Sequence, residues 1–160
     1  PPLTFFWLMA LQHHPAFEDK IEEWDNPVLK YLKNITCTHL NEEDTNLGFK
    51  IDFHFVANPY FTNEILSKEY HTKESCPWRG EIEAHDIKAT TIDWKEGKDV
   101  TVEKSQKKVK GGGAKKAKQK AKETLQPRDS LFRHFFRSLN KDSEVPPDVS
   151  PEEEDLIGEV

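Results

Sequence analysis

The fold is decided by residues 48–70, GFKIDFHFVANPYFTNEILSKEY, where apolar spacing and turn chemistry agree. Apolar side chains at every second position alternate with polar ones, which is the pattern of a strand that buries one face. The apolar members are Phe49, Ile51, Phe53 and Phe55. Asn58-Pro59 then turns the chain, because proline lacks a backbone N–H and disfavours a helical conformation in the residue before it. We therefore predict a returning strand over residues 60–70 and a sheet built around this pair.

Helices are predicted ahead of these strands. Thr4 is suited to cap an apolar helix that runs to about Gln12, and we expect this helix to be buried because it has almost no polar face. Pro15 opens a second helix, in which apolar residues at i, i+4 and i+7 form one side and carboxylates cover the other. A short helix restarts at residues 26–27, and a strand follows over residues 35–40.

The pattern is less regular after the strand pair. Residues 71–86 have no clear apolar period, so we expect a loop or a frayed extension of the second strand. Residues 90–94 are predicted as a strand, residues 95–98 as a turn, and residues 100–102 as the outgoing strand. Residues 128–139 are predicted to form one or two helical turns whose apolar side chains anchor the chain to the body.

Charge is distributed very unevenly along the 160 residues, whose formal net charge is −6. Residues 1–103 hold 10 Lys and Arg against 19 Asp and Glu, residues 104–122 hold 9 against none, and residues 123–160 hold 4 against 10. An acidic body of this kind attracts basic partners, and salt screens the attraction. The Pro, Asp, Glu and Ser composition after residue 140 indicates a segment that does not fold alone.

Motifs for catalysis or metal binding are not found. Cys37 and Cys76 provide neither a disulfide framework nor a cysteine zinc motif, and the seven histidines are not spaced as metal ligands. The GGGAKK segment lacks the G-x-x-x-x-G-K-[ST] spacing of a phosphate-binding loop, and no catalytic signature is present. We therefore expect no enzyme, no cofactor and no metal. The apolar run near residue 1 is too short to cross a bilayer and lacks a basic leader, which predicts neither membrane association nor secretion.

The lysine-rich segment, residues 104–122, has three interpretations. It is a solvated loop, a nuclear-import signal, or a segment that contacts phosphates without sequence specificity. Aromatic residues for base stacking are missing from it, which counts against single-strand recognition. The candidate import residues are Lys107, Lys108, Lys110, Lys115, Lys116, Lys118, Lys120 and Lys122.

Several strings, taken in order, resemble one protein family. They are FWLMALQHHP (6–15), VLKYLKNI (28–35), the 48–70 stretch with His71, TTIDWKEGKDVT (90–101), the lysine-rich segment and DSLFRHFF (129–136). Together they resemble the nucleosome assembly protein family over nearly the whole chain. LSKEYH and EGKD are also similar to the branch that contains the phosphatase inhibitor SET, whereas the lysine-rich segment followed by the aromatic residues 132–136 resembles the nucleosome assembly protein branch proper.

The resemblance implies an α+β fold, with an antiparallel sheet packed over helices in an earmuff-shaped domain. It implies a domain over residues 1–139, with residues 104–122 as a protruding basic hairpin or loop, and an acidic, disordered segment over 140–160 that leads to a missing C-terminal helix. The chain is then expected to be a fragment, or a divergent short form, that lacks the long N-terminal dimerisation helix. Family members act as ATP-independent histone chaperones in nucleus and cytoplasm, so core histones, import receptors and, in the full-length protein, a homodimer are the implied partners.

Acidic residues are the candidates for histone binding, because they compete with DNA phosphates for histone Lys and Arg. They are Glu18, Asp19, Glu22, Glu23, Asp25, Glu152, Glu153, Glu154 and Asp155. Two alternatives remain: an acidic interaction protein with a non-histone client, such as a SET-like phosphatase inhibitor, and a nucleic-acid-binding module that uses the lysine-rich segment. Each acidic residue could also belong to an ordinary solvated face.

Overall fold

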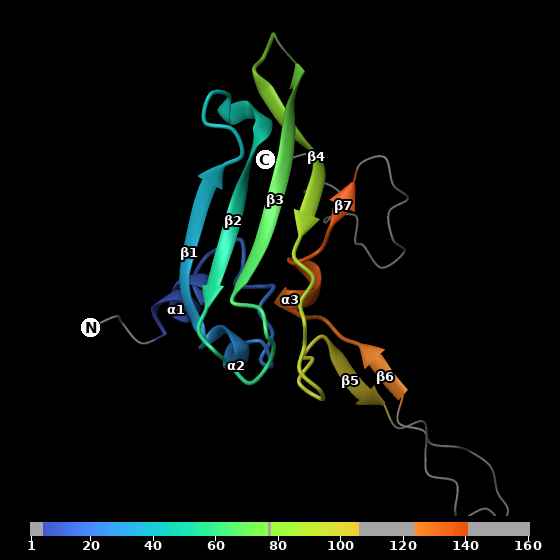
Figure 1. Cartoon of the computed structure of the whole chain (residues 1–160). Helices are drawn as coiled ribbons and strands as arrows, with labels where there is room; N and C mark the ends of the chain where they lie inside the picture. The colour runs from blue at the N-terminus through green and yellow to red at the C-terminus, as the bar shows by residue number, and fades with distance from the viewer. Residues whose placement is uncertain (1–4, 77, 106–123, 141–160) are drawn as a thin grey trace, which may run out of the picture.

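The computed structural model describes residues 5–76, 78–105 and 124–140. Within these ranges, one antiparallel sheet has the strand order β1-β2-β3-β4-β7, and a separate hairpin pairs β5 with β6 (Figure 1). The strands are β1 Leu32–His39, β2 Gly48–Phe55, β3 Ile65–Cys76, β4 Glu81–Ala89, β5 Val102–Ser105, β6 Thr124–Pro127 and β7 Leu139–Asn140. The predicted antiparallel sheet over helices is confirmed.

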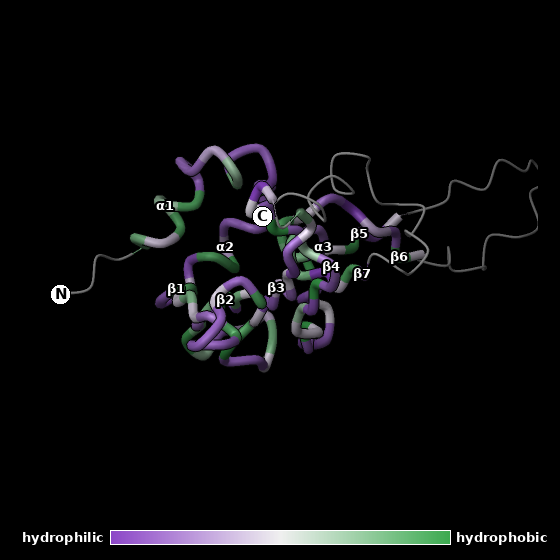
Figure 2. The backbone as a smooth tube through the Cα atoms, turned by 90° about the horizontal axis from the view of Figure 1, so that it is seen from above, coloured by the Kyte–Doolittle hydropathy of each residue, from purple (hydrophilic) through white to green (hydrophobic). Residues whose placement is uncertain are grey.

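The helices are short and lie near one end of the sheet (Figure 1). They are α1 Phe6–Gln12, α2 Asn26–Leu29 and α3 Leu131–His134, and a 3-10 turn, η1 Thr45–Leu47, lies near the other end. Seen from above, α1 and α2 lie on one side of β1 and β2 (Figure 2). This arrangement gives the sheet one covered face and one face that carries polar side chains.

The alternation that predicted β2 is confirmed in the structure. Phe53 and Phe55 are buried, whereas Asp52 and His54 point to the polar face, where Asp52 accepts a hydrogen bond from the Ser67 hydroxyl at 2.5 Å. The returning strand starts at Ile65 and not at residue 60. Its start is delayed because the Asn58 side chain accepts hydrogen bonds from the backbone N–H groups of residues 60 and 61, at 2.9 and 3.0 Å, and holds them in a turn.

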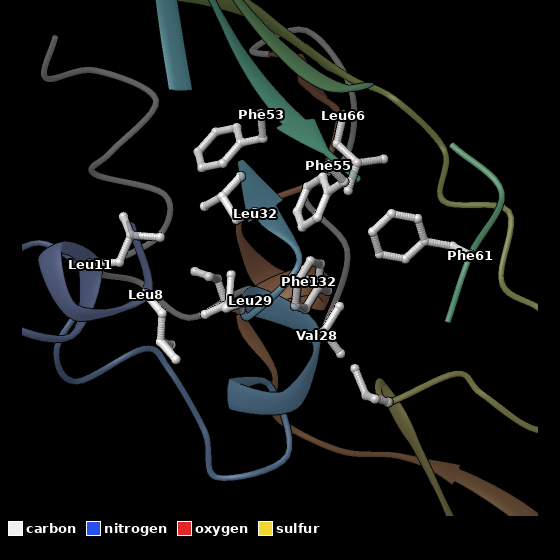
Figure 3. Close-up of a cluster of buried hydrophobic side chains, with 12 residues drawn as sticks. Leu8, Leu11, Val28, Leu29, Leu32, Phe53, Phe55, Phe61, Leu66 and Phe132 are labelled. Atoms are coloured by element: carbon white, nitrogen blue, oxygen red, sulfur yellow. The ribbon is translucent and has the colours of Figure 1, made fainter. Parts of the chain in front are cut away.

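The core forms where the helices meet the lower part of β2 and β3 (Figure 3). Leucines of α1 and α2 belong to the same buried cluster as the phenylalanines of β2, and α3 contributes Phe132 to it. The Phe132 ring lies 6.4, 6.2 and 5.8 Å from the rings of Phe55, Phe61 and Trp94. Burying side chains of this size contributes about 1.5–3 kcal/mol each. The predicted anchoring role of residues 128–139 therefore agrees with the packing, although the helix is only one turn long.

The first two predicted helices need correction. The helix at residues 6–12 forms, but Phe5 occupies its N-cap position with a left-handed backbone, and Thr4 lies outside the described residues. Only one side of it is buried: Leu8 and Leu11 are 7% and 5% exposed, whereas Phe6 and Met9 are 49% and 58% exposed. The helix predicted from Pro15 does not form. Residues 13–25 run through successive turns instead, closed by local backbone hydrogen bonds.

The region after residue 70 is more regular than its sequence pattern suggested. β3 continues to residue 76 and pairs with β4, and the two strands together occupy most of the predicted loop. Register shifts after His71 and after Glu74 interrupt the period-2 pattern on this hairpin, which is why alternation did not reveal it. Residues 90–94 do not form the predicted strand, and Trp94 makes only an isolated β-bridge with Phe61. The outgoing strand begins at residue 102, and β7 was not predicted.

Candidate functional site

The predicted acidic surface near the N-terminus forms on a turning segment, residues 18–25, which we call the acidic segment. Glu18, Asp19 and Glu23 are exposed, and Glu22 is half-buried. These four carboxylates are thus brought together on the surface by turns and not, as predicted, by the outer face of a helix. Their accessibility is compatible with contacts to a basic partner, but their helical arrangement was wrong.

Asp25, the fifth candidate of this segment, has a different position. It is 0% exposed and its carboxylate accepts three hydrogen bonds: from the Ser130 hydroxyl at 2.5 Å, from the Leu131 N–H at 2.8 Å and from the Glu22 N–H at 3.0 Å. The Ser130 oxygen in turn accepts from the Phe132 N–H at 3.1 Å, so the pair caps the start of α3. The placement of Asp25 on an exposed binding face is therefore wrong, because its acceptor capacity is used inside the protein.

A second anchor lies beside Asp25. The Trp24 indole N–H donates to the Asp129 carbonyl at 2.8 Å, and the Arg128 guanidinium lies 4.2 Å from the centre of the Trp24 ring. Arg128 also donates from Nε to the Val100 carbonyl at 2.7 Å. Stacking of a guanidinium on an indole stabilises such contacts by about 0.5–2 kcal/mol. The acidic segment is consequently fixed to the residues that follow β6, and Arg128 links these residues to Val100 ahead of β5.

The remaining candidates lie outside the described residues. This holds for all eight candidate import lysines and for the four carboxylates of residues 152–155. The strands on either side of the import lysines are described: Val102–Ser105 pairs in antiparallel fashion with Thr124–Pro127. The hairpin or loop expected over residues 104–122 falls mostly outside the described residues and stays a prediction.

A second group of carboxylates lies at the opposite end of the sheet. Glu42, Glu43 and Asp44 are exposed in the loop between β1 and β2, near the tip of the β3–β4 hairpin (Figure 1). The loop is held in place because Thr72 on β3 donates its hydroxyl to the Asn46 carbonyl at 2.7 Å. The run NEED in the sequence indicated this cluster, but it was not among the predicted binding residues. The protein therefore displays carboxylates at two separated places.

Neither a metal centre nor a membrane span is found in the part of the chain that the structure describes. It contains no group of three or more His, Cys, Asp or Glu side chains positioned to hold a metal ion. No helix in it is long and apolar enough to cross a membrane. Cys37 is exposed and Cys76 half-buried, both as free thiols.

Burial raises the pKa of Tyr70, whose ring stacks on Phe49 at 4.8 Å, to about 12.

These features define an acidic α+β domain that holds exposed carboxylates on anchored loops. The nucleosome assembly protein family model matches residues 1–159 of the chain. The chain therefore belongs to the nucleosome assembly protein family.

Individual relatives and solved structures agree with this assignment. The chain is 35% identical over 137 residues to nucleosome assembly protein 1-like 1 of Xenopus tropicalis, covering 81% of this chain and 34% of that protein. It is 35% identical over 151 residues to nucleosome assembly protein 1;1 of Arabidopsis thaliana, covering 94% and 36%. The structure of nucleosome assembly protein 1 from Plasmodium knowlesi superposes with a TM-score of 0.64 at 30% identity, covering 96% of this chain and 55% of that one. The chain thus spans about a third of the length of the first two relatives.

Proposed function

We propose that this chain is the histone-binding domain of a histone chaperone. It binds core histones through exposed carboxylates, shields them from non-specific contact with DNA, and assists nucleosome assembly, disassembly and histone transport. The observation that carries the proposal, together with family membership, is the anchored acidic segment with Glu18, Asp19, Glu22 and Glu23 at its surface. Carboxylates in this setting compete with DNA phosphates for histone Lys and Arg without any covalent step.

Asp25 has an indirect role in this proposal. Because it binds Ser130 and the start of α3, it fixes the end of the acidic segment and reduces the entropy lost when a partner orders the neighbouring carboxylates. Residues 152–155 remain in the proposed binding set, since their carboxylates are of the same chemical type. Cofactors and metals have no part in this mechanism.

We also propose partners for the basic segment and for the longer protein. The lysines between β5 and β6 bind import receptors, which would distribute the protein between nucleus and cytoplasm. The density of nine lysines within residues 104–122 supports this, because clustered lysine is the usual composition of an import signal. Dimerisation is proposed for the full-length protein only.

The test is binding of the chain to purified histone dimers and histone tetramers in a salt series, with duplex DNA as competitor. The variant Glu18→Gln/Asp19→Asn/Glu23→Gln removes three exposed charges of the acidic segment. We expect its affinity for histones to fall about tenfold, which corresponds to about 0.5 kcal/mol per charge, and the difference to shrink with salt.

The matched control removes the same charge at the other end of the sheet. In Glu42→Gln/Glu43→Gln/Glu74→Gln three exposed carboxylates are lost, and all three are distant from the acidic segment. We expect the control to bind histones about as well as the parent chain. Equal losses in both variants would mean that net charge alone drives binding, and a folded chain that binds no histone would refute the proposal.

A further inference from the structure

A pocket lies between α3 and the chain that leaves β4. It has a volume of about 390 Å³ and is lined on one side by residues 89–92 with Trp94 and Thr101, and on the other by α3 and the residues after it. Figure 1 shows α3 beside the connection from β4 to β5. The acidic segment does not contribute to this lining, so the pocket is separate from the surface proposed to bind histones.

The floor of the pocket is aromatic and fixed. The rings of Trp94 and Phe132 lie 5.8 Å apart, and Phe132 stacks on Phe136 at 5.9 Å. At one edge of the pocket the two sides are joined by a hydrogen bond, in which the Ala89 N–H donates to the Ser138 hydroxyl at 3.0 Å. Phe132 is itself buried in the core, whereas Trp94 and Phe136 are half-buried and provide the aromatic surface that an apolar or aromatic side chain would contact.

The wall of the pocket is cationic, in contrast to the acidic body around it. Arg133 and Arg137 are four residues apart and both line the pocket, and threonine hydroxyls line the opposite side. The Arg133 guanidinium lies 3.9 Å from a carboxylate oxygen of Asp129, so a carboxylate already approaches this group within the chain. Guanidinium groups bind carboxylates through paired, charge-assisted hydrogen bonds, and their five donors can serve more than one acceptor.

We propose that this pocket binds an acidic peptide of a partner protein, with an apolar or aromatic residue on the floor and flanking carboxylates on Arg133 and Arg137. Charge complementarity argues for this occupant and against a basic histone segment, which the two arginines would repel. An apolar peptide without acidic residues would use the floor but would gain nothing from the cationic wall. The chain would then hold basic partners on its acidic segment and an acidic partner here.

The experiment uses the full chain and a fluorescein-labelled heptapeptide with a central phenylalanine between two groups of three glutamates. Binding is followed by fluorescence anisotropy. We expect Arg133→Gln/Arg137→Gln to weaken binding at least about tenfold, since two charge-assisted contacts are lost. The matched control Lys33→Gln/Arg79→Gln removes the same charge from exposed positions outside the pocket and is expected to leave binding nearly unchanged. Replacing the phenylalanine of the peptide by alanine should also weaken binding.

Three results would overturn the proposal. The first is no binding of the heptapeptide by the folded chain, and the second is an equal loss in the control variant, which would indicate attraction by net charge only. The third concerns the chain's own acidic residues 152–155, which follow Ser138 in the sequence. If neutralising these four carboxylates raises the affinity for the heptapeptide tenfold or more, the chain's own segment and not a separate partner is the occupant. Histone binding by Arg133→Gln/Arg137→Gln is expected to be retained, so this test and that of the proposed function can fail independently.

Discussion

Replacement of Asp25 by alanine is expected to destabilise the domain strongly. Replacement of an exposed acidic residue would have little effect on stability, but Asp25 is buried. The Asp25 carboxylate is fully buried and accepts from the Ser130 hydroxyl and from the N–H groups of Leu131 and Glu22. Asp25→Ala leaves these buried donors without an acceptor, at about 1–3 kcal/mol for each donor that water cannot reach, and removes the cap of α3. With partial relaxation we expect a loss of about 3–5 kcal/mol, which is a large share of a typical total of about 5–15 kcal/mol.

The assay is urea denaturation followed by tryptophan fluorescence, with Asp19→Ala as the exposed control. Asp19→Ala should change the free energy of unfolding by no more than about 0.5 kcal/mol. The double variant Asp25→Ala/Ser130→Ala should be less destabilised than the sum of its two single variants, because each partner loses the same hydrogen bond. A loss below about 1 kcal/mol in Asp25→Ala, or strict additivity with Ser130→Ala, would refute the assignment of Asp25 as an internal anchor.

Two further predictions concern α1 and the sheet. Leu11→Ala is expected to lower the free energy of unfolding by about 2–4 kcal/mol, whereas Met9→Ala on the exposed side of α1 should change it by about 0.5 kcal/mol or less. Urea denaturation of both variants measures these changes, and similar losses in the two would contradict a helix that buries only one side. Since the pKa of Tyr70 is raised from 10.0 to about 12 by burial, its contribution to stability is complete below pH 10 and is lost as the pH rises toward 12. Stability measured across this window should decline less in Tyr70→Phe, and identical declines would contradict the burial of that hydroxyl.

Local pattern predicted β2 correctly but not the helix expected from Pro15, whose residues form turns instead. Period-2 alternation identified β2 because one face of that strand meets the core and the other meets solvent. The turn at Asn58 was located correctly, but its length was not, because the backbone N–H groups of residues 60 and 61 donate to the Asn58 side chain and extend the turn. β4 was missed because bulges in the β3–β4 pairing shift which residues face the core.

The candidate site divides in the same way. Local charge identified the exposed carboxylates Glu18, Asp19 and Glu23, because charged side chains are mostly exposed. The role of Asp25 could not be read from its neighbours, since its partners Ser130 and Leu131 lie more than 100 positions later in the sequence. The pocket beside α3 is also formed by segments far apart in the sequence, and no local motif in either segment indicates it.

The same long separation affects the order in which the domain can fold during synthesis. Phe55, Phe61 and Trp94 all pack against Phe132, and α3 is capped by Asp25 from the start of the chain. A growing chain therefore carries β1 to β4 before it has the helix that closes them, and their aromatic faces stay open to solvent until residues 131–132 are made. Contacts between such distant residues slow folding, and exposed aromatic surface promotes aggregation in the interval. The earlier segments that pack against α3 are thus stabilised only after residues 131–132 have been synthesised.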